Sequence, residues 1–140
     1  MSDQDLEHHI HAAGADRAPR VTPADIEAEI ANECYFTAQD GIVKALEDEG
    51  LDGRYFAQTH LSPALGLLTF CVLVLHNGFT ATGESACASP ENFNAEIGRR
   101  IARENAIAKV WPLLGFRLRD KLHAVATAIQ PEPGADQAQA

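Results

Sequence analysis

The most strongly patterned part of the chain lies in its middle, where Leu67–Leu75 reads LLTFCVLVL. Its β-branched and aromatic residues predict a strand. Asn77 and Gly78 follow, and an Asn-Gly pair between two strand-like runs predicts a hairpin with a type I′ turn, because both central residues of that turn take positive φ. A two-residue loop would place Val74 opposite Ala81. Both faces of the first strand are apolar, so we expect both to be covered, one of them by another subunit.

Two short helices are predicted before the hairpin. Residues 22–34 begin with Thr-Pro-Ala-Asp, which supplies a capping hydroxyl and a proline at the first helical position. Ile26, Ile30 and Cys34 then recur four residues apart and form one apolar stripe. Residues 37–50 begin with a threonine, carry an aspartate three positions later as in a capping box, and end at a glycine, which commonly ends helices.

Strand and helix signals continue on both sides of the hairpin. Residues 55–60 favour a strand, and a long helix is predicted from Ser89 and Pro90 onward. Its apolar positions at helical spacing are Phe93, Ile97, Ile101, Ala108 and Trp111. Pro112 predicts a kink or break, after which residues 113–129 continue as a second helix. The fold class is therefore α+β, a small antiparallel β-hairpin sheet packed with a long C-terminal helix kinked at a proline and preceded by two short helices.

The chain of 140 residues has room for one ordinary domain, which we place at residues 21–130. Residues 1–20 carry no apolar periodicity and are expected to form a disordered, acidic, histidine-containing arm. Its histidines, His8, His9 and His11, could bind a metal ion, but a solvated arm is the expectation. Residues 131–140 are polar and contain proline, so a flexible tail is predicted there.

The net charge of −9 argues against a general nucleic-acid binder and against binding to an anionic membrane. The longest apolar run, Leu65–Leu75, is too short to span a bilayer. The N-terminal residues lack a secretion signal, so we expect the protein in the cytoplasm of a bacterial host. Three cysteines without a C-x-x-C pair indicate neither a disulfide framework nor a zinc site.

One segment opposes the acidic balance of the chain. Residues 91–122 hold 7 basic and 4 acidic side chains, whereas residues 1–60 hold 4 basic and 13 acidic ones. Arg99 and Arg103 are four residues apart and share one face of the predicted helix. They indicate either a clamp for one small anionic ligand or ion pairs with acidic helices, and both interpretations stay open.

Motifs of enzymes are missing from the sequence: it has no phosphate-binding loop, no dinucleotide fingerprint, no H-E-x-x-H and no G-x-S-x-G. No nucleophile, base or metal set is evident either. We therefore expect a protein that is not an enzyme and that uses no cofactor and no metal.

The run from Leu68 to Leu122, above all its segments NGF, GESAC, SPENF and EIGRRIA and its W-P dipeptide, resembles a family of small phage and prophage proteins named after gene 49 and gene 66 of their founding phages. Glu33–Ala38 and the following Asp40-Gly41 resemble the N-terminal element of that family. The resemblance covers about residues 22–122.

The hairpin-plus-helix core is also similar to the first type of Thoeris anti-defence protein. That similarity implies a homo-oligomer that sequesters a cyclic ADP-ribose isomer or a cyclic oligonucleotide between subunits, without turnover. Arginines and an aromatic residue would hold the ligand. The residues whose chemistry suits this role are Phe79, Asn92, Phe93, Arg99, Arg103, Arg117 and Arg119. The alternative is a protein–protein interaction module or an inhibitor that docks on a host enzyme, as an acidic mimic of nucleic acid.

Overall fold

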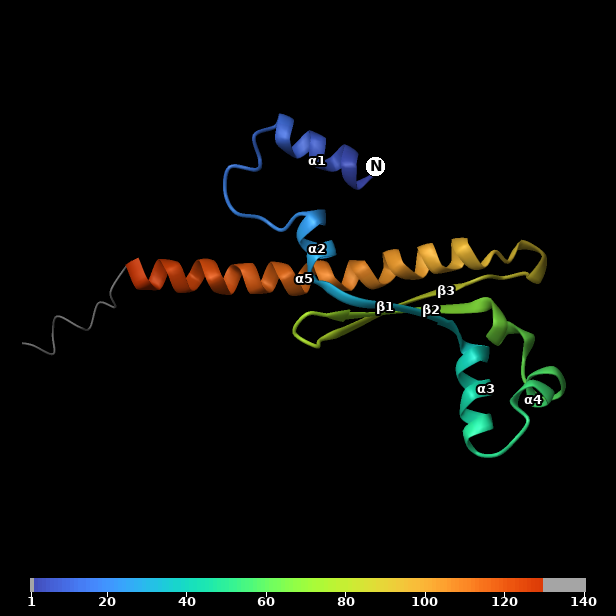
Figure 1. Ribbon diagram of the computed structural model, residues 1–140. Coiled ribbons are helices and arrows are strands. Elements are labelled where there is room, and N and C mark those ends of the chain that lie inside the picture. Colours follow the sequence, from blue (N-terminus) through green and yellow to red (C-terminus); the bar gives the residue numbers. More distant parts are fainter. Residues whose placement is uncertain (1, 130–140) are drawn as a thin grey trace, which may run out of the picture. The chain divides into compact units, whose positions relative to one another are not determined.

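A computed structural model describes residues 2–129 of the chain. The flexible tail expected at residues 131–140 lies outside the described residues. The helices and strands in chain order are α1 (Asp3–Ala12), α2 (Pro23–Glu29), β1 (Ile30–Thr37), α3 (Ala38–Asp48), α4 (Gly53–Thr59), β2 (Leu68–Leu75), β3 (Thr80–Ala86) and α5 (Ala95–Ile129). Short 3₁₀ turns precede β2 and α5. The predicted α+β class is confirmed (Figure 1).

The described residues form two compact units, one of residues 27–110 and one of residues 2–26 with 111–129. The larger unit contains an antiparallel sheet in the order β1-β2-β3, and the N-terminal part of α5 lies along one of its faces (Figure 1). The core of this unit lies between that face and the helix. The covered face of β2 consists of Thr69, Cys71, Leu73 and Leu75, all buried.

The third strand is β1 and not the segment predicted at residues 55–60. Residues 30–37 pair with β2, although the spacing of Ile26, Ile30 and Cys34 predicted a helix through residue 34. A spacing of four residues fits both the helical period and the alternation of a strand. Pairing with β2 therefore makes residues 30–37 a strand, and α2 ends at Glu29.

Residues 53–59 form helix α4, so the strand predicted at residues 55–60 is wrong. The side chain of Asp52 accepts a hydrogen bond from the backbone N–H of Tyr55 (3.1 Å) and caps this helix. A Cβ atom on Gly53 would lie 2.5 Å from the carbonyl oxygen of Val43, so α4 begins in close contact with α3.

The hairpin forms at the predicted place, but its loop has three residues and its register differs by one. Leu75 N donates to Phe79 O and Gly78 N donates to Leu75 O, both at 2.8 Å. Gly78 has φ +87°, whereas no non-glycine residue between 2 and 129 has a positive φ. The predicted type I′ turn is therefore wrong, because it needs a positive φ at Asn77 as well. Leu73 pairs with Ala81 as a result.

Helix α5 begins at Ala95, later than predicted, because the side chain of Asn94 accepts the hydrogen bond from Ile97 N (3.0 Å). Ser89 makes no such capping bond to the 3₁₀ turn that follows it. The helix runs through Pro112 to Ile129 as one element, so the two predicted helices are one. Proline removes a single backbone hydrogen bond, and the good helix formers around it sustain the helix.

The buried side of α5 in the larger unit is not the predicted stripe. Ile97 and Ile101 are 57% and 42% exposed. The buried positions are smaller and recur every four residues: Gly98, Ala102, Ala106 and Val110. Small side chains let a helix approach a strand closely, which the larger isoleucines would prevent.

The smaller unit begins with α1, although residues 1–20 were expected to be disordered. The Ser2 side chain accepts a hydrogen bond from Asp5 N (3.2 Å), and the Asp5 carboxylate accepts one from Ser2 N (3.3 Å). This capping box stabilises a helix whose apolar stripe is too weak to be detected by periodicity.

Candidate functional site

Two small hollows flank the start of α5 in the larger unit. The first, of about 140 Å³, is lined by Leu67, Thr69, Ser85, Ala86, Cys87, Asn92, Phe93, Asn94, Ile97, Gly98 and Ile101. The second, of about 90 Å³, is lined by Tyr35, Phe36, Thr37, Asp40, Thr69, Phe93, Ala95 and Arg99. Thr69 and the half-buried Phe93 line both hollows, and the second hollow also contains the charged side chains of Asp40 and Arg99.

Arg99 is the cation of the second hollow. It is exposed, and it makes no hydrogen bond or ion pair with any residue between 2 and 129. Asp40 lines the same hollow, but its carboxylate accepts a hydrogen bond from Thr37 N (2.9 Å) and belongs to the cap of α3. Within residues 2–129, the Arg99 guanidinium therefore keeps unused hydrogen-bond donors, for which an anion is the natural partner.

Arg103, one turn further along α5, is engaged within the protein. Its Nε atom donates to Glu33 Oε1 (2.6 Å), and its two terminal nitrogens donate to the carboxylate of Glu27 at 3.0 and 2.7 Å. The hydrogen bonds that Arg103 donates to both glutamates raise its pKa, with the bonds to Glu27 contributing most. The guanidinium is thus neutralised by two carboxylates and ties α5 to α2 and β1.

Tyr35 extends this network on the covered face of the sheet. Its hydroxyl donates to Glu33 Oε2 (2.9 Å), and partial burial together with this bond raises the pKa of Tyr35. Partial burial acts to raise the pKa of Glu33, but hydrogen bonds from Arg103 and Tyr35 outweigh it and hold that pKa below its ordinary value. Burial also raises the pKa of the Cys71 thiol, which lies opposite Tyr35 on the neighbouring strand, so this cysteine stays protonated near neutral pH.

The structure brings together three of the seven predicted site residues, Asn92, Phe93 and Arg99. Arg103 lies beside them but is bound to Glu27 and Glu33. The remaining predicted residues are Phe79, Arg117 and Arg119.

Those three residues lie elsewhere in the chain. Phe79 follows the loop at the tip of the hairpin, whereas Thr69 and Ser85 at the hollows lie six residue pairs away along it. At about 3.3 Å per residue, that separation is roughly 20 Å. Arg117 and Arg119 belong to the part of α5 in the smaller unit.

Sequence reasoning missed the residues that β1 contributes to the second hollow, Tyr35, Phe36 and Thr37. A helix was predicted to end next to them, so they were not assigned to a sheet. The signal was present: three consecutive residues with high strand propensity follow Cys34.

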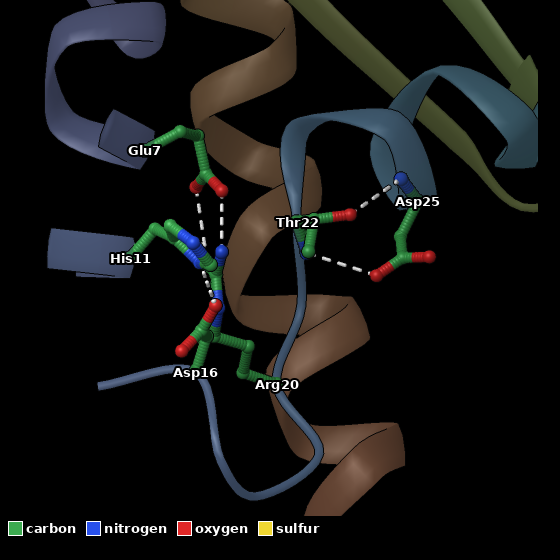
Figure 2. A network of polar contacts seen from close by, with 6 residues as sticks. All are labelled: Glu7, His11, Asp16, Arg20, Thr22 and Asp25. Carbon is green, nitrogen blue, oxygen red and sulfur yellow. Dashed lines mark hydrogen bonds and ion pairs between the residues drawn. The ribbon is translucent and has the colours of Figure 1, made fainter. Parts of the chain in front are cut away.

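A second polar cluster lies within the smaller unit (Figure 2). Arg20 binds both carboxylate oxygens of Glu7, and His11 Nδ1 lies 2.7 Å from Asp16 Oδ2. These two pairs tie α1 to the segment that leads into α2, whose start is capped by a reciprocal pair of hydrogen bonds between Thr22 and Asp25. We assign this cluster to the folding of the N-terminal segment.

A shallow groove of about 550 Å³ opens beside this cluster, between α1 and the start of α2. Across residues 2–129, no group of three or more His, Cys, Asp or Glu side chains is arranged to hold a metal ion. No helix in the same range is long and apolar enough to cross a membrane.

Among known proteins, this chain matches the model of a protein family. Neither a curated protein nor a solved structure matches the chain significantly. The model of one family, described as phage protein (N4 Gp49/phage Sf6 gene 66), matches residues 21–122, which include both hollows and the whole of the sheet. The chain therefore belongs to the phage protein (N4 Gp49/phage Sf6 gene 66) family.

Proposed function

We propose that this phage protein binds a small anionic nucleotide signal in the cytoplasm of the bacterial host and sequesters it without turnover. The observation that carries the proposal is the position of Arg99, a cation without a partner among residues 2–129, on a hollow lined by aromatic rings. The matching family is one of phage proteins, and a signal-binding protein would protect a phage from a host nucleotide-signalling defence.

The chemistry of the two hollows suits the parts of a nucleotide. A guanidinium binds phosphate through charge-assisted hydrogen bonds, which Arg99 can donate. The ring of Phe93, which lines both hollows, offers a surface on which a base can stack. The side chain of Asn92 carries an amide that can donate to and accept from a base edge. We therefore name a cyclic ADP-ribose isomer or a cyclic oligonucleotide as the ligand class.

Binding without turnover is supported by the state of the titratable groups in the second hollow. The Tyr35 hydroxyl is hydrogen-bonded to Glu33 and has a raised pKa, so it is a poor base near neutral pH. The Asp40 carboxylate is occupied by the cap of α3. Neither group is poised to attack a phosphodiester or to activate water.

The hollows are small for such a ligand. Pockets for drug-sized molecules measure roughly 300–1,000 Å³, whereas these measure about 140 and 90 Å³. We propose that a second subunit supplies the remaining walls, so that the functional form is a homo-oligomer and the ligand lies at the boundary between copies.

Calorimetric titration of the pure protein with cyclic ADP-ribose isomers and with cyclic di- and trinucleotides tests the proposal. Arg99→Gln should weaken binding by about one to two orders of magnitude, because a hydrogen bond to a charged group contributes roughly 1.5–3 kcal/mol. Arg100→Gln is the matched control, since the Arg100 side chain is 82% exposed and pairs with Glu104 at 3.6 Å. Mass spectrometry of the released ligand should return it unchanged.

Two outcomes would contradict this function. If none of these ligands produced heat of binding, the proposed class of ligand would be wrong. If Arg99→Gln and Arg100→Gln bound the ligand with equal affinity, the ligand would not bind at Arg99.

A protein–protein interaction module, docking on a host enzyme, is the second candidate. It is favoured by the face of the sheet opposite α5, where Phe36 is 40% exposed and stacks on Phe70 with ring centroids 5.4 Å apart. The net charge of −9 would suit an acidic mimic of nucleic acid. Recovery of a host enzyme on immobilised protein, together with no heat from any nucleotide, would favour this function.

A further inference from the structure

Strand β1 forms one edge of the sheet, and its hydrogen-bonding groups can be assigned from the ladder. Leu75 N donates to Phe79 O, so Leu75 faces β3, and the alternation of an antiparallel ladder turns Val74 and Val72 toward β1. On β1 their partners are Asn32 and Cys34, which bond to β2. Glu33 lies between these two residues and Tyr35 follows Cys34. The backbone N–H and C=O groups of Glu33 and Tyr35 therefore point away from the sheet.

The two edges of the sheet differ in how they are protected. At the β3 edge, the side-chain amide of Asn105 donates to the outward carbonyl of Glu84 (2.8 Å). The open face of β3 is polar there, with Thr80, Thr82 and Glu84. At the β1 edge, no side chain between residues 2 and 129 bonds to the outward backbone groups of Glu33 or Tyr35. Unprotected edges of this kind pair with further strands.

Charge does not protect the β1 edge either. A charged residue on an edge strand normally repels a second copy of that strand. Glu33 is the single charged residue of β1, and its carboxylate is matched by Arg103 at 2.6 Å. Exposed Cys34 and Phe36 extend the apolar open face up to this edge.

We propose that β1 pairs with β1 of a second copy of the chain, antiparallel and about a two-fold axis, to form a six-stranded sheet. The register places Glu33 opposite Tyr35 of the second copy and Cys34 opposite Cys34. This register uses the outward groups of both residues. It also avoids two glutamates directly opposite each other, which would destabilise the pair.

Such a dimer would place a second chain beside the hollow that holds Arg99, because Tyr35 and Thr37 line that hollow from the same edge strand. The added strand would enlarge the small site, a consequence that rests on the proposed function. The interface itself does not, and the measurements below use no nucleotide, so the two proposals fail independently.

Cross-linking through cysteine tests the register. Residues opposite each other in a non-hydrogen-bonded antiparallel pair have Cα atoms about 4.5 Å apart, so dibromobimane should bridge the two Cys34 thiols with loss of two bromide ions. Cys71 is buried and Cys87 is half-buried. We expect a covalent dimer that Cys34→Ser abolishes and Cys87→Ser retains. A product joined through Cys87, or no product at all, would overturn the interface.

Light scattering of two lysine variants tests the edge. Cys34, Val72 and Thr82 form one row across the sheet, so Cys34→Lys and Thr82→Lys place the same charge on its two opposite edges. The wild type and Thr82→Lys should have twice the 15.1 kDa chain mass, and Cys34→Lys should have the chain mass. A monomeric wild type across the micromolar range, or a Cys34→Lys dimer, would overturn the proposal. If Cys34→Lys does not fold, the presence or absence of the Cys34 cross-link in the wild-type protein decides whether β1 pairs with β1.

Discussion

A Cβ atom on Gly83 would lie 2.1 Å from the carbonyl oxygen of Ala102 and 2.3 Å from the backbone nitrogen of Ala106. Strand β3 and helix α5 therefore contact each other backbone to backbone, with no room for a side chain between them. Ala102 and Ala106 are fully buried by this approach. The contact holds α5 against the sheet and so determines where Phe93 and Arg99 lie, since both are carried by α5 or the segment before it.

Gly83→Ala should be strongly destabilising, because the added methyl group overlaps the α5 backbone, which cannot move as a flexible side chain would. We expect a loss of about 3 kcal/mol in the free energy of unfolding, the upper end for overpacking, measured by urea denaturation. Gly115→Ala is the control. No other part of residues 2–129 comes within 4 Å of its Cβ position beyond the adjoining helix backbone, so alanine in this helix should stabilise by up to about 1 kcal/mol. Equal stabilities of the two variants would mean that α5 is not in contact with Gly83.

Gly78→Val should lower the melting temperature, because Gly78 has φ +87° and a β-branched residue is strained in that conformation. The expected cost is about 1–2 kcal/mol. Gly78→Asn should cost less, since asparagine tolerates the left-handed region. A valine variant that melts like the wild type would contradict the three-residue loop.

Arg103→Ala should reduce stability by about 1–3 kcal/mol, the range for lost hydrogen bonds to charged groups. Arg103 is 28% exposed and holds Glu27 and Glu33 together, so its removal leaves two carboxylates without their cation. Arg100→Ala should change stability by less than about 1 kcal/mol, as exposed pairs do. Thermal melts of both variants check the difference. If Arg103→Ala were as stable as the wild type but bound the nucleotide more weakly, Arg103 would be a ligand-binding residue.

The stability of the protein should fall in acid, partly through Glu33. The pKa of Glu33 is below its ordinary value of 4.5 in the folded protein, so its contribution is complete above that value and is lost as the pH falls through the lowered pKa. Glu33→Gln should make the dependence of the urea midpoint on pH shallower between about pH 6 and pH 3. In an Arg103→Ala background, the same substitution should change the slope much less. If Glu33→Gln changed the slope as much in that background as in the wild type, a group other than Arg103 would be lowering the pKa of Glu33.

The α+β class, the hairpin at Asn77-Gly78 and the long C-terminal helix were predictable from the sequence, because each depends on neighbours within a few residues. Asn-Gly marks a turn, and a run such as LTFCVLVL favours a strand whatever lies opposite. The resemblance to the phage family was also a property of the sequence alone, and the family match confirms it.

The tertiary structure decided the identity of the third strand, the hairpin register, the buried side of α5 and the partners of Arg103. Ile26, Ile30 and Cys34 fit a helix and a strand equally well, and only pairing with β2, some forty residues away in sequence, selects the strand. Glu33 is seventy residues from Arg103, so no local pattern could show that this arginine is neutralised while Arg99 has no such partner among residues 2–129. Local periodicity describes which faces a segment can offer, and long-range packing selects the face that is used.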